Sequence, residues 1–230
     1  DWNRAGYDDT NWIPAGRVSI PSGTLRAQMM PGMKVTESLK PVSIRKQGDK
    51  QILDIGQNMA GWLRIRIKGQ AGDSIRLRFA ERLQPDGEIF TKNLRDAHCT
   101  DIYVVSGREP QDTTWAPRFV YHGFRYVEIS GYPNAKTEDF TAEVVDDEMA
   151  HTGTFTCSDE TLNKVLRNAF WGIRSNYKGM PVDCPQRNER QPWLRWVPGV
   201  KASFSTIMPY TINGHVIFVK HSVRTAASRM

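Results

Sequence analysis

The sequence predicts a multidomain chain in which an antiparallel β-sandwich is followed by the start of an all-α domain. Between about residues 41 and 149, apolar and charged residues alternate with the period of two that is typical of half-buried strands. Turns rich in Gly and Asp separate these short segments at regular intervals. After residue 150 the apolar residues take the spacing of an amphipathic helix.

Residues 1–40 are rich in turn formers, with aromatic residues scattered among charged ones. We expect them to be the end of a preceding β domain. The chain begins at Asp1 without a methionine, so the lack of a leader carries no information on export, and localisation is left open.

Two segments of the sandwich show the strand pattern most clearly. Residues 63–67 and 75–79 each place apolar residues on one face and arginines on the other. The glycine-containing segment 69–73 between them is predicted to be a hairpin connection. Further strands are expected over residues 101–105 and 124–129.

The helical domain is predicted to begin with an N-cap at Ser158. Asp159 and Glu160 would then lie in the first turn, where the helix dipole favours acidic residues. The helix is expected to end near Gly179. Its apolar face would consist of Leu162, Val165, Leu166, Ala169, Phe170, Ile173 and Tyr177.

Composition excludes several classes of protein. The formal net charge is +6, but all six basic residues of the excess lie among the last 41 residues, which contain no acidic residue. The first 189 residues hold 25 basic and 25 acidic residues, so a nucleic-acid-binding protein is not indicated. The three cysteines have no metal-ligand spacing and are odd in number, and no apolar run reaches membrane-spanning length. We expect no cofactor, no metal and no membrane partner, and the oligomeric state is left open.

The run from residue 183 to residue 196 carries the chemistry. It places Glu189 close in sequence to Asp183, Arg187 and Trp193, in a segment whose two prolines disfavour a long helix. Such a loop suits a sugar-cleaving site, because an acid can protonate a leaving oxygen while charged groups hold hydroxyls and a ring stacks on the sugar. Bland alternatives stay open: Glu189 in surface ion pairs, Asp183 as a cap and Trp193 as a core residue.

Three other features have weaker claims to function. The segment 54–62 is interpreted as a structural corner leading into a strand. His122 is interpreted as part of a strand start with packed aromatic residues, without a chemical role. Glu81 with Asp86 could form an acid pair, but we expect both side chains to be solvated in a hairpin.

The run 183–193, together with 119–126 and 54–62, resembles the bacterial α-L-rhamnosidases of glycoside hydrolase family 78. The resemblance covers nearly all of residues 1–194. It implies that residues 1–40 end an accessory β-sandwich, that 41–149 form the concanavalin-like β-sandwich, and that 150–194 begin an (α/α)6 six-hairpin barrel.

The family's activity implies roles for the loop residues. Its members hydrolyse terminal α-L-rhamnosides with inversion, so the partner would be a rhamnose-containing oligosaccharide, polysaccharide or glycoside. By the resemblance Glu189 is the general acid, and Asp183, Arg187 and Trp193 line the rhamnose pocket. The alternative is a non-catalytic carbohydrate-binding β-sandwich module.

The sequence departs from the family pattern in two places, one before the acid and one behind it. Asn188 stands where most members have aspartate, and Arg195-Trp196 follows Leu194 where Gly-Asp is expected. The codons that can encode residues 199–214 permit, in another frame, an acidic, amphipathic stretch like that of the family. We therefore expect residues 195–230 to be an out-of-frame tail, and this truncated chain to lack the general base and the packing partners of its helix.

Overall fold

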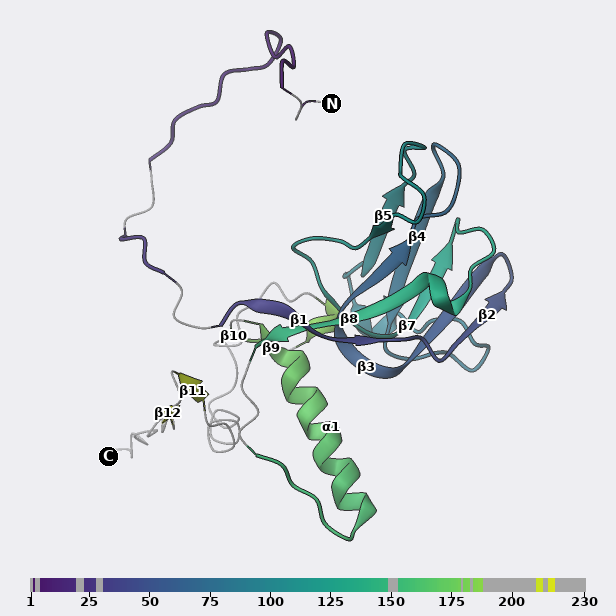
Figure 1. The fold of residues 1–230 in the computed structure, drawn as a ribbon, viewed down its shortest axis with the longest axis vertical. Helices are drawn as coiled ribbons and strands as arrows, with labels where there is room; N and C mark the ends of the chain where they lie inside the picture. Colours follow the sequence, from purple (N-terminus) through teal and green to yellow (C-terminus); the bar gives the residue numbers. More distant parts are fainter. Residues whose placement is uncertain are drawn as a thin grey trace, which may run out of the picture.

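Eight strands form one continuous antiparallel sheet (Figure 1). The computed structural model describes residues 2, 5–19, 23–27, 31–148, 153–178, 180–182, 184–187, 210–212 and 215–217. The eight strands of the main sheet are β1 (Met33–Leu39), β2 (Ser43–Gln47), β3 (Lys50–Arg66), β4 (Ser74–Ala80), β5 (Thr100–Val104), β6 (Thr114–Trp115), β7 (His122–Ser130) and β8 (Phe140–Asp147).

The sheet order is β1-β8-β3-β7-β4-β5, with β2 and β6 also paired to β3. The long strand β3 is the hub of this arrangement. Its first part pairs with β2 through residues 50–54, and its second part pairs with β8 through residues 61–65. β7 pairs with both parts, on either side of an irregularity between Asp54 and Met59.

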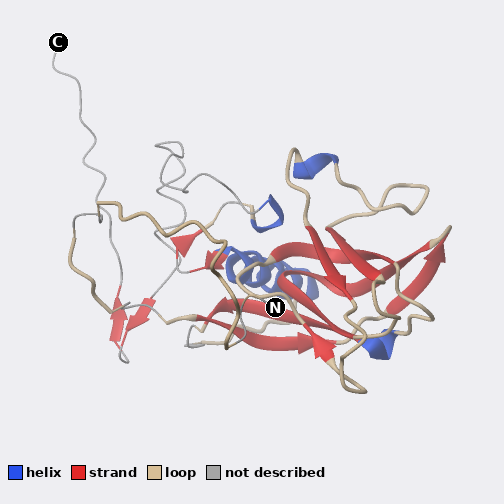
Figure 2. Cartoon of the chain, turned by 90° about the horizontal axis from the view of Figure 1, so that it is seen from above, coloured by secondary structure: helices blue, strands red, loops and turns tan. Residues whose placement is uncertain are grey.

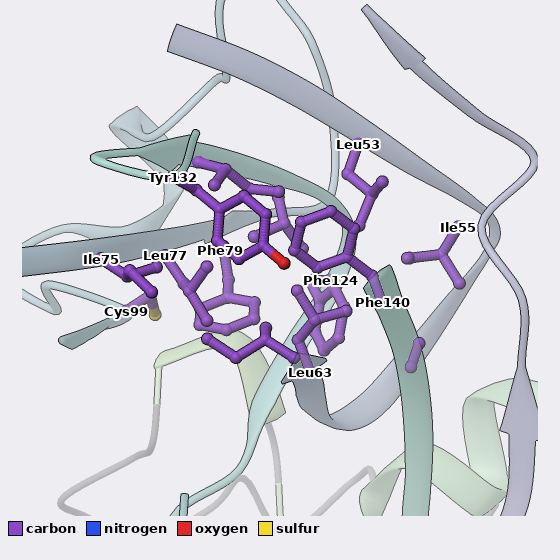
Figure 3. Close-up of a cluster of buried hydrophobic side chains, with 14 of the residues drawn as sticks. Leu53, Ile55, Leu63, Ile75, Leu77, Phe79, Cys99, Phe124, Tyr132 and Phe140 are labelled. Atoms are coloured by element: carbon purple, nitrogen blue, oxygen red, sulfur yellow. The ribbon is translucent and has the colours of Figure 1, made fainter. Parts of the chain in front are cut away.

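Side chains from four strands meet in one core (Figure 3). The predicted alternation explains which residues point inward: Leu63 and Ile65 of β3 are fully buried, as are Ile75, Leu77 and Phe79 of β4. Phe124 of β7 and Phe140 of β8 complete the centre. The predicted β-sandwich is confirmed.

The predicted hairpin over residues 69–73 is wrong. Gly69 and Gly72 do adopt positive φ, as a tight connection requires. However, β3 and β4 do not pair with each other, because β7 lies between them in the sheet. Turn chemistry predicts that the chain reverses there but does not say which strand becomes the neighbour.

α1 (Glu160–Asn176) is the one α-helix among the described residues, whose other regular elements are strands and short 3₁₀ helices (Figure 2). Its N-cap is Asp159 rather than the predicted Ser158, since the Asp159 carboxylate accepts hydrogen bonds from the backbone N–H groups of Thr161 and Leu162. The helix ends at Asn176, three residues before Gly179.

One side of α1 is attached to the sandwich. Arg174 donates to Asp146 of β8, to Glu37 of β1 at 2.5 Å and to the hydroxyl of Thr36 at 2.6 Å. Its guanidinium also lies 4.9 Å from the ring centre of Trp171, which packs against the core. Other apolar residues of the helix remain exposed, namely Leu162, Val165, Leu166 and Phe170.

Short elements complete the fold. β1 pairs with β8, so the sheet begins before the predicted boundary at residue 40. The described residues between 2 and 27 contain no helix or strand. The remaining elements are η1 (Lys92–Leu94), η2 (Thr137–Asp139), η3 (Pro185–Arg187) and the paired strands β9 (Tyr177–Lys178) with β10 (Met180–Pro181) and β11 (Tyr210–Ile212) with β12 (His215–Ile217).

Candidate active site

The segment 183–196, called the acid loop below, follows α1 after the short strands β9 and β10. The backbone turns back on itself there, with the Val182 N–H donating to the carbonyl of Asn176 at 2.7 Å. The chain then enters η3, where the Arg187 N–H donates to the carbonyl of Cys184 at 3.0 Å. A short turn therefore connects the helix to the loop, in agreement with the effect of its prolines.

The described residues include one of the four predicted site residues. Arg187 is half-buried at the end of η3, and its guanidinium donates to the sulfur of Cys184. Asp183, Glu189 and Trp193 lie outside the described residues.

η3 packs on the first residues of β7, so the loop lies against the sandwich. Pro185 is buried in this contact. Gly123 of β7 approaches Gln186 so closely that a side chain on Gly123 would overlap the Gln186 backbone. The segment 119–126 and the acid loop, which lie far apart in the sequence, are thus in direct contact.

The segment 54–62, which lies in β3, also contacts β7. Arg125 of β7 binds Asp54 of β3 through two hydrogen bonds, of 2.8 and 2.9 Å. The Asp54 carboxylate also accepts from the N–H of Gly56, which adopts positive φ. All three segments that carry the family resemblance therefore meet around β7.

A cavity of about 400 Å³ lies where β3, β7, α1 and η3 meet. Amide and hydroxyl groups and one carboxylate are prominent in its lining. The lining residues are Gln57, Asn58, Met59, Glu81, Gly123, Asn168, Trp171, Gly172, Ser175, Asn176, Pro185 and Gln186.

Glu81 is the carboxylate of this cavity, and it is partly exposed to solvent but also hydrogen-bonded. Its side chain is half-buried and accepts hydrogen bonds from the amides of Asn58, at 3.1 Å, and Asn93, at 3.2 Å. One amide comes from β3 and the other from η1, which are far apart in the sequence, so no local sequence pattern indicates that they converge on Glu81.

His122 has a defined environment at the start of β7. Its Nε2 lies 3.0 Å from Oδ1 of Asp101, and its ring stacks on Phe79 with 4.2 Å between ring centres. Phe79 in turn meets Phe124 edge-on at 4.8 Å. The interpretation of His122 as part of a strand start with packed aromatic residues is confirmed.

The part of the chain that the structure describes holds no cluster of three or more His, Cys, Asp or Glu side chains suited to a metal ion. No helix within that part is both long and apolar enough to cross a membrane.

Two family models match this chain. The bacterial α-L-rhamnosidase concanavalin-like domain matches residues 44–146, and the bacterial α-L-rhamnosidase six-hairpin glycosidase domain matches residues 150–228. The chain belongs to the bacterial α-L-rhamnosidase family. The second match includes most of residues 195–230, which sequence reasoning did not relate to the family.

Similar proteins agree with this assignment. An α-L-rhamnosidase of Streptomyces avermitilis is 39% identical over 203 residues, covering 84% of this chain and 19% of that protein. The structure of an α-L-rhamnosidase from Dictyoglumus thermophilum has a TM-score of 0.74 and 38% identity, covering 82% of this chain and 21% of that one. The Streptomyces avermitilis enzyme in complex with L-rhamnose has a TM-score of 0.73 and 38% identity, over 82% and 18%.

This rhamnosidase-family chain spans about a fifth of the length of the curated relatives it matches. The matched part includes the concanavalin-like sandwich and the first helix of the six-hairpin domain, with η3 and the loop behind it.

Proposed function

We propose that the enzyme containing this chain hydrolyses terminal, non-reducing α-L-rhamnose residues from rhamnosides with inversion of configuration. Glu189 acts as the general acid, and Asp183, Arg187 and Trp193 line the rhamnose pocket. The observation that carries this proposal is the match of two consecutive rhamnosidase domains on either side of residue 150.

The residue types of the loop suit this chemistry. A carboxylic acid at Glu189 would protonate the oxygen of the leaving group as the glycosidic bond breaks. An inverting enzyme needs a second carboxylate about 6.5–9.5 Å away, which activates a water on the opposite face of the sugar. Arg187 and Asp183 would bind the sugar hydroxyls, and Trp193 would pack against an apolar face of the ring.

The 230-residue chain alone is proposed to be inactive. By the family resemblance, the general base comes from a part of the six-hairpin domain that this chain does not contain. A single carboxyl cannot both protonate the leaving group and activate the opposite water.

The proposal is tested by expressing the full-length enzyme, with the family-like frame behind Leu194, and comparing it with Glu189→Gln. We expect hydrolysis of 4-nitrophenyl α-L-rhamnoside and a fall in kcat of at least about 100-fold on an alkyl rhamnoside for Glu189→Gln. The loss should be smaller on the 4-nitrophenyl substrate, because 4-nitrophenolate leaves without much protonation. Proton NMR should detect β-L-rhamnose as the first product.

Two results would reject parts of this function. Full activity of Glu189→Gln would remove Glu189 as the acid, and first release of the α-anomer would remove inversion. Binding of L-rhamnose by calorimetry without hydrolysis of any rhamnoside would favour a carbohydrate-binding module.

We further propose that residues 195–230 are read out of frame, although the match of the six-hairpin domain extends to residue 228 and counts against this idea. The absence of acidic residues from Arg190 onward supports this idea. Sequencing the DNA around codon 194 tests it: a single-base change should restore an open, family-like frame. If no such change exists, the tail is an in-frame part of the protein.

A further inference from the structure

The backbone of Gln186 rests directly on the sandwich at Gly123. A Cβ atom added to Gly123 would lie 2.6 Å from the Gln186 nitrogen and 3.0 Å from its Cα, closer than atoms can approach. Gly123 itself does not adopt positive φ. A glycine is therefore required here for close approach of a second backbone, and not for its own conformation.

Cys99 contacts the carbonyl group of Gln186. Its thiol donates a hydrogen bond to the carbonyl oxygen of Gln186. The Cys99 carbonyl in turn accepts from the N–H of Phe79 in β4 at 3.0 Å, which fixes Cys99 to the sheet. Cys99 has a φ of 40°, an unfavourable conformation for a residue with a side chain, and the surrounding contacts hold it there.

The thiol stays protonated at neutral pH. Burial of Cys99 raises the pKa of its thiol to about 11, with smaller contributions in the same direction from the charges of Asp101 and Glu81. A protonated thiol can act as a hydrogen-bond donor, whereas a thiolate cannot.

The support beneath these two contacts is packed against the core of the sandwich. Cys99 and Gly123 are both buried. Cys99 lies two residues before Asp101 and Gly123 directly follows His122, and Asp101 and His122 are themselves hydrogen-bonded to each other. His122 stacks on Phe79, which lies in the centre of the core. The backbone nitrogen of Gln186 therefore lies against Gly123, and its carbonyl oxygen accepts a hydrogen bond from Cys99. Both partners belong to the sandwich.

We propose that Gly123 and Cys99 are positioning residues for the general acid, so that the sandwich domain forms part of the catalytic machinery. Gln186 stands three residues before Glu189, a distance of at most about 10 Å along an extended chain. On this proposal a shift at Gln186 is transmitted to the acid, and a misplacement of about 1 Å can cost on the order of 100-fold in rate. This inference rests on the proposed role of Glu189.

The contact can be tested in the 230-residue chain without any activity. Hydrogen–deuterium exchange with mass spectrometry should find the peptide around 180–187 protected, with at least about tenfold faster exchange there in Gly123→Ala. Gly153→Ala is the matched control, because a Cβ at Gly153 would meet nothing within 4 Å. Exchange around 180–187 that is unprotected, or unchanged in Gly123→Ala, would overturn the proposal.

Kinetics of the full-length enzyme test the positioning role. Gly123→Ala should lower kcat on an alkyl rhamnoside by about 10- to 100-fold, with KM changed less than about threefold. The loss on 4-nitrophenyl α-L-rhamnoside should be clearly smaller, since that leaving group depends less on the acid. Cys99→Ala should show the same difference between substrates, and Cys99→Ser, which keeps a donor, should recover most of the activity.

A general loss of structure predicts a different result. Equal losses on the two substrates, or no loss in Gly123→Ala, would reject the positioning role while leaving the role of Glu189 intact. If Glu189→Gln itself keeps full activity, the proposed function fails instead, and the exchange experiment still reports on the contact.

Discussion

Arg125 and Asp54 form a two-point ion pair that fastens β7 to the bend of β3, with Nε 2.8 Å from Oδ1 and an Nη nitrogen 2.9 Å from Oδ2. The pair sits at the irregularity where β3 leaves its register with β7. Because Arg125 is two residues after Gly123, the ion pair stabilises the same strand on which the acid loop rests.

Replacing Arg125 with Lys should lower the free energy of unfolding by about 1 kcal/mol. Lys cannot bind both carboxylate oxygens in the same geometry, and the partial exposure of the two side chains limits the loss through solvent screening. Arg76→Lys, at an exposed position on β4, is the control and should change the free energy of unfolding by less than about 0.5 kcal/mol. Urea denaturation of the chain measures both, and equal effects would contradict the prediction.

The contribution of this pair should disappear in acid. Burial raises the pKa of Asp54, but hydrogen bonds from Arg125 and the Gly56 N–H outweigh this effect, so the pKa lies below its usual value. A depressed carboxyl pKa stabilises the folded state above the unfolded pKa of about 3.9 and loses this effect as the pH falls through the folded value. The gap between wild type and Arg125→Lys should therefore narrow below about pH 4.

Lys178 should give the chain a stability that rises with pH above 8. Burial lowers the pKa of Lys178 to about 8, although the carboxylates of Asp146 and Asp147 oppose this change. Its ammonium group donates to the carbonyl of Val145 and lies 5.6 Å from the ring centre of Tyr121. Between pH 8 and the unfolded pKa of about 10.4, the unfolded state binds more protons than the folded state, so unfolding becomes harder as pH rises.

Comparison with Lys178→Met isolates this effect from other groups that titrate in the same range. Wild type should gain stability relative to the variant between pH 7.5 and 9.5, by up to about 1.4 kcal/mol per pH unit. Urea midpoints at the two pH values measure the difference. A constant difference between the two proteins would show that Lys178 keeps an ordinary pKa.

Truncation of apolar residues should separate the sandwich core from the exposed face of α1. Phe124→Ala should cost about 3–5 kcal/mol, because Phe124 is fully buried and packs edge-on against Phe79. Leu162→Ala should change stability by less than about 0.5 kcal/mol, because Leu162 is 51% exposed. A large cost at Leu162 would mean that its side chain is covered in solution.

The sequence could predict those parts of the fold that depend on local patterns. Period-two alternation correctly predicts that Leu63 and Ile65 point inward, since burial on one face is a local property of the strand. The neighbours of a strand are not local, and the segment 69–73 therefore looks like a hairpin although β7 separates β3 from β4. The Cys99–Gln186 contact spans 87 residues and has no sequence signature at all.

The candidate site likewise has features that the sequence predicts and features that it does not. Arg187 could be chosen from the sequence because it shares one short loop with Asp183, Glu189 and Trp193. The sequence suggests Glu81 only as a possible partner of Asp86, and its hydrogen bonds to Asn58 of β3 and Asn93 of η1 could not be predicted, because these residues are brought together by the fold. Chemistry concentrated in one loop is visible in a sequence, whereas the support for that loop requires the fold.

The start of α1 offers a direct test of a choice between two adjacent residues. Ser158 and Asp159 are both good N-cap residues by type, but the Asp159 carboxylate accepts from the N–H of Thr161 at 2.7 Å and of Leu162 at 3.2 Å. Asp159→Ala should therefore cost the helix about 1 kcal/mol, and Ser158→Ala should cost much less. Asp159→Asn keeps the acceptor and loses the charge near the helix N-terminus, so its cost should be a few tenths of a kcal/mol. Hydrogen exchange of the amides in residues 160–165 measures all three, and faster exchange in Ser158→Ala than in Asp159→Ala would move the N-cap to Ser158.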